Sequence, residues 1–147
     1  MQTVYFDTCS LQRLLDDKTQ VRIALEAEAV TAVIALCEQG QLALVSSAVL
    51  DFEVARNPHP QRRAVVTGIL TRHHQFLPLT AHVHTLARRF ADDGFTPLDA
   101  LHIATAQDAA VDYSCTCDDR FLRKARSHPA ITITVVSPLE LAQEVLQ

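Results

Sequence analysis

Acidic side chains stand at four points along the chain where they could share one task. Asp7 directly follows the first apolar run, and Asp118 directly follows a later one, whereas Glu53 and Asp99 lie within apolar segments. Several carboxylates brought together without a basic partner repel one another unless a cation lies between them. Oxygen donors alone favour a hard divalent ion, Mg²⁺ or Mn²⁺. Such an ion activates water and orients a phosphate ester, which is the chemistry of a nuclease.

Each of these acids also has a purely structural explanation. Asp7 and Asp118 could be helix N-caps, Asp119 could favour a helix macrodipole, and Asp99 could be the third residue of a capping box. Glu53 differs, because at about 100° per residue it falls near the middle of the apolar sector of its helix. A carboxylate aimed at the core needs a cation or hydrogen bonds, since burying it alone is very costly.

The elements that must position these acids alternate between strand and helix. The apolar runs predict strands over 4–6, 42–45, 111–117 and 131–136, with a short run at 76–79. Helical periodicity and capping signals predict helices over 9–17, 20–38, 47–56, 61–74, 80–93, 97–110, 119–127 and 138–146. On the helix over 20–38, Arg22 and Glu26 are expected to pair on the polar face.

This alternation predicts an α/β fold, with a mainly parallel central sheet and helices on both faces, built as one domain of residues 1–147. In such sheets the functional groups collect just beyond the carboxyl ends of the strands. The acids that follow the apolar runs are therefore expected to meet at one edge of the sheet.

Composition narrows the class of protein. The 147 residues are 48% apolar and 20% charged, which is typical of a soluble globular domain. Three scattered glycines are too few for a phosphate-binding loop or a dinucleotide fingerprint. The chain shows no export signal and no apolar run long enough to cross a membrane, so a cytoplasmic location is expected. The net charge of −4 is unusual for a nucleic-acid binder unless acids and bases are separated on the surface.

The cysteines and histidines do not indicate a zinc site. Cys115 and Cys117 form a C-x-C pair, Cys9 and Cys37 have no partner pattern, and the seven histidines lack H-E-x-x-H spacing. In a chain that is not exported, four reduced and mostly buried thiols are expected.

Four motifs together resemble those of the PIN domain, a small metal-dependent nuclease fold, and within it the toxins of VapBC-type toxin–antitoxin pairs. They are residues 5–11 around Asp7, 47–53 ending at Glu53, 97–104 around Asp99 and 116–121 around Asp118. All four stand in the family's order, and they span nearly the whole chain.

The resemblance implies a three-layer α/β/α sandwich and endonucleolytic cleavage of RNA with Mg²⁺ or Mn²⁺. It implies a small antitoxin protein as partner, and a homodimer. The implied catalytic and metal-binding residues are Asp7, Glu53, Asp99 and Asp118, with Asp119 as a substitute for the fourth acid and Thr8 and Ser10 as hydroxyl groups that support the ligands.

The chain carries local groups of basic residues that could contact phosphates. Arg120, Arg123, Lys124 and Arg126 lie on the helix that follows Asp118, whereas the arginine pairs at 62–63 and 88–89 are equally well explained as solvated surface residues. His102 shares a helix face with Asp99 and could donate to it, but a satisfied core histidine is the favoured interpretation.

Two alternatives to a ribonuclease remain. One is a catalytically silent PIN-like module that binds RNA or protein, against which the four intact acids argue. The other is an aspartyl-phosphate phosphatase, which would place a second aspartate two residues after the first. Cys9 stands at that position.

Overall fold

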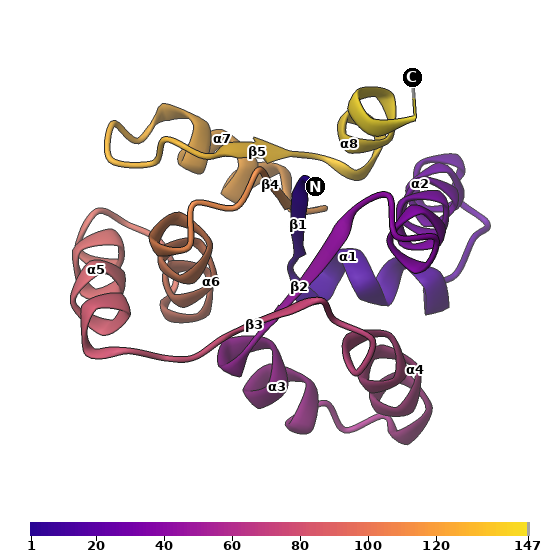
Figure 1. Cartoon of the computed structure of the whole chain (residues 1–147), viewed down its shortest axis with the longest axis horizontal. Helices are drawn as coiled ribbons and strands as arrows, with labels where there is room; N and C mark the ends of the chain where they lie inside the picture. Colours follow the sequence, from indigo (N-terminus) through magenta and orange to yellow (C-terminus); the bar gives the residue numbers. More distant parts are fainter. Residues whose placement is uncertain (147) are drawn as a thin grey trace.

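Five parallel strands form the central sheet in a computed structural model that describes residues 1–146 (Figure 1). They are β1 (Thr3–Phe6), β2 (Ala43–Ser47), β3 (Gln75–Leu77), β4 (Tyr113–Cys115) and β5 (Thr134–Val136). Their order in the sheet is β3-β2-β1-β4-β5, and every neighbouring pair is parallel. The predicted mainly parallel α/β sheet is confirmed.

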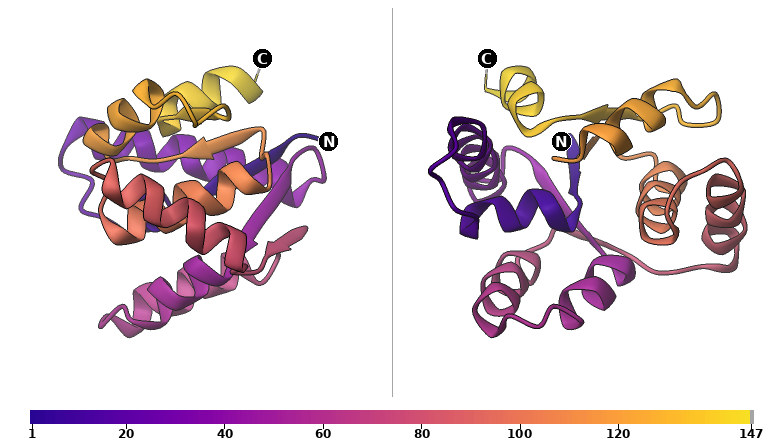
Figure 2. Two further views of the ribbon diagram at one scale, coloured as in Figure 1. Left: turned by 90° about the vertical axis from the view of Figure 1, so that its left-hand side faces the viewer. Right: turned by 180° about the vertical axis from the view of Figure 1, so that it is seen from behind.

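Helices cover both sides of this sheet. They are α1 (Thr8–Gln12), α2 (Val21–Glu38), α3 (Ala48–Ala55), α4 (Pro60–Leu70), α5 (Ala81–Asp92), α6 (Pro97–Asp108), α7 (Asp119–Ser127) and α8 (Pro138–Val145). The helices α1, α2 and α8 lie on one side, and α5 and α6 lie on the other (Figures 1 and 2). The helix α7 packs with α5 and α6, while α3 and α4 flank the β3 end of the sheet. This is the predicted three-layer α/β/α arrangement.

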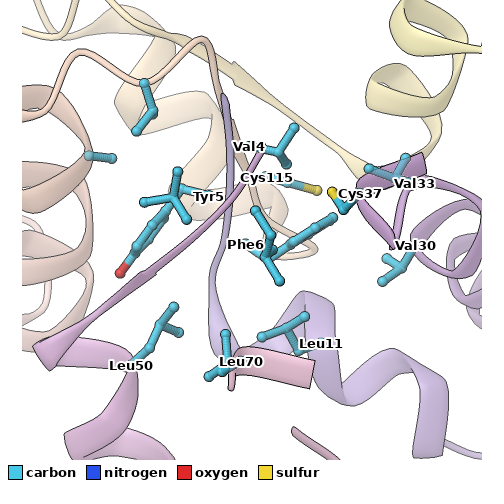
Figure 3. Close-up of a cluster of buried hydrophobic side chains, with 14 of the residues drawn as sticks. Val4, Tyr5, Phe6, Leu11, Val30, Val33, Cys37, Leu50, Leu70 and Cys115 are labelled. Atoms are coloured by element: carbon cyan, nitrogen blue, oxygen red, sulfur yellow. The ribbon is translucent and has the colours of Figure 1, made fainter. Parts of the chain in front are cut away.

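The central strand β1 is buried on both faces, as a parallel sheet requires. Val4, Tyr5 and Phe6 are all inaccessible to solvent. Side chains alternate along the strand, so Phe6 points toward Val30 and Val33 of α2, whereas Tyr5 points to the opposite side (Figure 3). This alternation places the Tyr5 hydroxyl on the side of the sheet that α6 covers.

Several element boundaries differ from those that the sequence predicts. The predicted strand over 131–136 begins only at Thr134, because the N–H groups of Thr132 and Ile133 donate to the Gln107 side chain at 2.9 and 3.3 Å. The predicted helix over 9–17 ends at Gln12 and continues as a 3₁₀ turn over Arg13–Leu15. The predicted strand over 111–117 is three residues long, and the predicted helix over 61–74 stops at Leu70.

The position of Glu26 is a further correction. The expected pair with Arg22 is present, with 3.5 Å between Arg22 Nε and Glu26 Oε1, but Glu26 is only 2% exposed instead of lying on the polar face. A second cation makes this burial tolerable, because Arg13 Nε lies 3.1 Å from the same oxygen. The chain therefore has a buried ion-pair group that joins the start of α2 to the 3₁₀ turn.

The four cysteines are free thiols, and Cys37, Cys115 and Cys117 are buried. This agrees with the expected reduced and mostly buried state. Among residues 1–146, no helix combines the length and the apolar character needed to cross a membrane.

Candidate functional site

Two of the predicted acids follow adjacent strands at the centre of the sheet. The register pairs Phe6 of β1 with Cys115 of β4, and the Asp7 N–H donates to the Cys115 carbonyl oxygen at 3.1 Å. Because β2 lies on the other side of β1, the strand order reverses at this point. Open α/β sheets bind their ligands at such a reversal, beyond the carboxyl ends of the strands.

Capping fixes the carboxylates of Asp7 and Asp118. Asp7 is the N-cap of α1, and its Oδ1 accepts the Ser10 N–H at 3.0 Å. Asp118 is the N-cap of α7, and its Oδ1 accepts the N–H groups of Arg120 and Phe121 at 3.0 and 3.1 Å. The predicted cap roles are confirmed for both residues. Capping holds each carboxylate at the sheet edge. Because the capping bonds use only Oδ1, they leave Oδ2 of each residue for a ligand.

Asp99 lies in the first turn of α6 and lines one recess together with Asp118. Thr96 caps this helix by accepting the Asp99 N–H at 3.3 Å. The recess is also lined by Arg120 and Lys124. Partial burial raises the pKa of the Asp99 carboxyl, hydrogen bonding of this carboxyl with the Thr96 side chain opposes the rise, and the negative charges of Asp118 and then Asp7 add to it. Three of the four predicted acids therefore interact electrostatically.

Glu53 is held by two hydrogen bonds. Its Oε1 lies 2.9 Å from Nε2 of His102 and also accepts from the Thr8 hydroxyl. Partial burial works against ionisation of Glu53, but the bonds from His102 and Thr8 outweigh it, so the pKa of Glu53 is lowered. The side chain is 28% exposed, which places it at the edge of the core. Phe52, the residue before Glu53 on α3, is 53% exposed and faces solvent.

His102 is a buried histidine with both ring nitrogens bonded, as the favoured interpretation predicts. Its Nδ1 lies 2.6 Å from the hydroxyl oxygen of Tyr5, and its partner among the acids is Glu53. Sequence reasoning considered a bond to Asp99 and missed the link to Glu53. Two signals could have found it, namely a core-facing carboxylate that needs a donor and a polar ring on an otherwise apolar helix.

Asp119 points toward α2. Its two oxygens lie 2.8 and 2.7 Å from the two terminal nitrogens of Arg22, and this bidentate pair lowers the pKa of Asp119. Of the two adjacent aspartates, Asp118 lines the recess with Asp99.

The two predicted hydroxyl residues occupy different positions. Thr8 contacts Glu53 directly, as described above. The Ser10 hydroxyl donates to the Cys115 carbonyl oxygen at 3.3 Å, while its backbone N–H serves Asp7. Ser10 therefore contacts Asp7 through its backbone N–H and not through its hydroxyl.

The chemistry of these acids fits a hard divalent ion, since the donors are all carboxylate oxygens, and the charges of Asp118 and Asp7 add to the rise in the Asp99 pKa that burial causes. Within residues 1–146, however, no three His, Cys, Asp or Glu side chains are close enough together to hold a metal ion as they stand. The structure brings Asp7, Asp99 and Asp118 into electrostatic range, and Glu53 is bonded to His102.

The sequence model of the PIN domain matches residues 4–127. The chain belongs to the PIN domain family. This match includes all four predicted acids. No curated protein matches the chain significantly.

Solved structures with the same PIN fold include three from bacteria. FitAcB from Neisseria gonorrhoeae is 19% identical, with a TM-score of 0.60, and the match covers 92% of this chain and 98% of that one. DNA-bound VapBC from Salmonella typhimurium is 16% identical, with a TM-score of 0.63 and coverage of 94% and 99%. VapBC2 from Rickettsia felis, bound to a DNA fragment from its promoter, is 10% identical, with a TM-score of 0.61 and coverage of 92% and 98%.

Some basic residues of this PIN domain line the recess, whereas others form bonds with residues outside it. Arg120 and Lys124 line the recess, where the Lys124 ammonium donates to the Gly94 carbonyl oxygen at 2.6 Å. Arg126 donates to the Val135 carbonyl oxygen at 3.0 Å and pairs with Glu140 at 2.7 Å.

Two further arginines differ in their environment. Arg123 is exposed on α7. Arg62, for which the sequence left open a phosphate contact or a solvated position, is partly buried and pairs with Asp16 at 2.8 Å.

Proposed function

We propose that this PIN domain is a metal-dependent endoribonuclease that acts as the toxin of a toxin–antitoxin pair. In this proposal Asp7, Glu53, Asp99 and Asp118 are its catalytic and metal-binding residues. The observation that carries the proposal is that Asp99 and Asp118 line one recess where the strand order reverses, while Asp7 follows the neighbouring strand β1 and its negative charge also acts on Asp99. Membership of a nuclease family supports the same activity.

The four acids would hold Mg²⁺ or Mn²⁺, which when bound supplies an activated water and charge neutralisation at the scissile phosphate. The N-caps of α1 and α7 keep two of these carboxylates fixed at the sheet edge. The Thr8 hydroxyl orients the carboxylate of Glu53. Because these side chains are already held in place, less conformational entropy is lost when the ion and the substrate bind.

The basic residues beside the recess supply contacts to the RNA backbone. Arg120 and Lys124 border Asp99 and Asp118, so they can attract phosphates to an otherwise acidic site. Arg123, exposed on the same helix, would extend this contact. Arg126 contributes less, because Glu140 already neutralises it.

A small antitoxin protein and a second copy of the chain are the proposed partners. The solved structures of similar fold are described as FitAcB, VapBC and VapBC2, two of them DNA-bound. An antitoxin is the regulator that a ribonuclease acting on the cell's own RNA would need.

Incubation of total RNA with the purified protein tests the activity. We expect cleavage with Mn²⁺ or Mg²⁺, no cleavage with EDTA, and no cleavage by Asp7→Asn. The control is Asp51→Asn, which neutralises an exposed acid of α3. Asp7→Asn cleaving as fast as the parent would overturn the nuclease site, and a parent that binds RNA without cutting it would indicate the silent module. Mapping the cut ends then identifies the RNA class.

Replacing Asp118 and Asp119 by asparagine, one at a time, separates the roles of these two adjacent aspartates. Asp118→Asn should lower cleavage at least about a hundredfold, because it removes a proposed metal ligand beside Asp99. Asp119→Asn should keep cleavage within about fivefold, since that carboxylate is exposed and paired with Arg22. Initial rates at saturating Mn²⁺ measure both variants. Equal losses in the two variants would show that Asp119 also belongs to the site.

Divalent ions should also stabilise the folded protein. An ion that binds only the native state raises the free energy of unfolding by about 2.7 kcal/mol at a hundred times its Kd. We therefore expect Mn²⁺ to raise Tm in the parent and in Asp51→Asn but not in Asp7→Asn. Thermal unfolding followed by circular dichroism, with Ca²⁺ and high NaCl as ionic controls, checks this. A Tm shift of the same size in Asp7→Asn would place the ion elsewhere.

A further inference from the structure

A continuous set of buried hydrogen bonds ends on Glu53. The Tyr5 hydroxyl oxygen lies 2.9 Å from Ser47 Oγ and 2.6 Å from Nδ1 of His102. The other ring nitrogen of His102 lies 2.9 Å from Glu53 Oε1, which the Thr8 hydroxyl also reaches. Tyr5, Ser47, His102 and Thr8 are all buried. Hydrogen bonds in such surroundings are strong, and a missing partner is costly.

The chemistry of the groups sets the direction of these bonds. A carboxylate only accepts, so Nε2 of His102 carries the proton that reaches Glu53. In a neutral ring Nδ1 then has no proton and accepts from the Tyr5 hydroxyl. The Ser47 oxygen already accepts the Leu50 N–H at 3.0 Å, which leaves its own proton for Tyr5. Ser47 thus donates to Tyr5, Tyr5 donates to His102, and His102 donates to Glu53.

Together with Thr8 of α1, the bonded residues come from five elements, and the bonds join parts of the chain that are far apart in the sequence. Tyr5 belongs to β1, Ser47 ends β2 and caps α3, Glu53 lies on α3, and His102 lies on α6. Figure 3 shows the Tyr5 side chain pointing to the opposite side of β1 from Phe6. One helix, α6, therefore carries both an acid of the site, Asp99, and the ring that restrains another.

We propose that His102, supported by Tyr5, is a positioning residue that fixes the Glu53 carboxylate for the metal-dependent reaction. This inference rests on the proposed nuclease function. A glutamate that is 28% exposed would otherwise sample several rotamers, and ordering it on ligand binding would cost free energy. The described bonds both end on Oε1, so Oε2 remains available to a ligand. Groups that orient a metal ligand in this way typically change metal affinity or activity by about 10- to 100-fold.

The test compares four variants with the parent. His102→Leu removes both bonds, His102→Gln keeps a side-chain donor, and Tyr5→Phe removes only the hydroxyl. The matched control is Thr105→Val on the same helix, because the buried Thr105 hydroxyl has no hydrogen-bond partner in the part of the chain that the structure describes. The readouts are Mn²⁺ affinity by calorimetry, kcat and KM for RNA cleavage, and the His102 tautomer by ¹⁵N NMR of the metal-free protein.

We expect His102→Leu to lower Mn²⁺ affinity or kcat about 10- to 100-fold with KM for RNA unchanged. His102→Gln should recover part of this loss, Tyr5→Phe should lose less, and Thr105→Val should match the parent. The NMR spectrum should show the Nε2–H tautomer. If His102→Leu does not fold, His102→Gln and Tyr5→Phe still test the role of His102. In both, Mn²⁺ affinity or kcat should fall while KM for RNA stays unchanged.

Two results would overturn the inference while the nuclease proposal stands. One is a Mn²⁺ affinity and a kcat equal to the parent's in folded His102→Leu, or in both His102→Gln and Tyr5→Phe. The other is a His102 ring that carries its proton on Nδ1 in the parent protein. A parent that neither binds Mn²⁺ nor cleaves RNA would instead overturn the nuclease function, and with it any role for His102 in that reaction.

Discussion

Asp99→Asn should abolish RNA cleavage while leaving the metal-free protein at least as stable as the parent. Cleavage should fall at least about a hundredfold, because the variant loses a proposed ligand for the ion that stabilises charge in the reaction. Stability should not fall, because burial and the charges of Asp118 and Asp7 already disfavour the ionised Asp99. The neutral amide removes that repulsion. Opposite effects on activity and stability are typical of a functional carboxylate.

The gain in stability should depend on pH. Because the pKa of Asp99 is raised on folding, its ionised form destabilises the native state above that raised pKa. Below the ordinary pKa the carboxyl is protonated in both states, and the difference between parent and variant should vanish. Urea unfolding of both proteins in EDTA, from pH 3 to pH 8 in steps of about one unit, measures this.

Asp51→Asn is the control, because it neutralises an exposed acid outside the recess. It should keep cleavage at the parent's level and show no such dependence on pH. An Asp99→Asn variant that is destabilised at neutral pH and still cleaves RNA would assign Asp99 a capping role alone.

The sheet and the placement of the acids at its edge could be predicted, because both follow from local pattern. Asp7 and Asp118 directly follow apolar runs, and the topology of parallel sheets brings such positions together. The helix over 119–127 was predicted with its observed bounds because Asp118 is a clear cap and the apolar residues repeat with helical period. Capping and period act within a few residues, so the sequence alone contains them.

Features decided by contacts between distant elements could not be predicted. The strand β5 is short because the Gln107 side chain, from α6, takes the N–H groups of Thr132 and Ile133. The bond from His102 to Glu53 joins residues 49 positions apart. Asp118 and Asp119 could not be distinguished from sequence, because the partner of Asp119 is Arg22 at the start of α2. In each case the deciding group lies on another element.

The buried Glu26 should be the most sensitive charged residue for stability. Arg13 and Arg22 both reach its Oε1, and removing one member of a buried ion pair leaves the other without compensation. A full loss would be about 3 to 5 kcal/mol, but Arg13 is partly exposed and keeps its pair with Asp16. We therefore expect Glu26→Ala to lower the free energy of unfolding by about 2 to 3 kcal/mol and Tm by about 5 to 10 °C.

The matched control is Glu28→Ala, which removes an exposed glutamate from the same helix and should change stability by less than about 0.5 kcal/mol. Urea and thermal unfolding compare the two variants, and equal stability would show that burial of Glu26 gives it no special role. Below its lowered Tm, Glu26→Ala should still cleave RNA, because Glu26 acts on the fold and the proposed metal ligands lie elsewhere. Loss of cleavage in the folded variant would contradict this separation of the ion-pair group from the site.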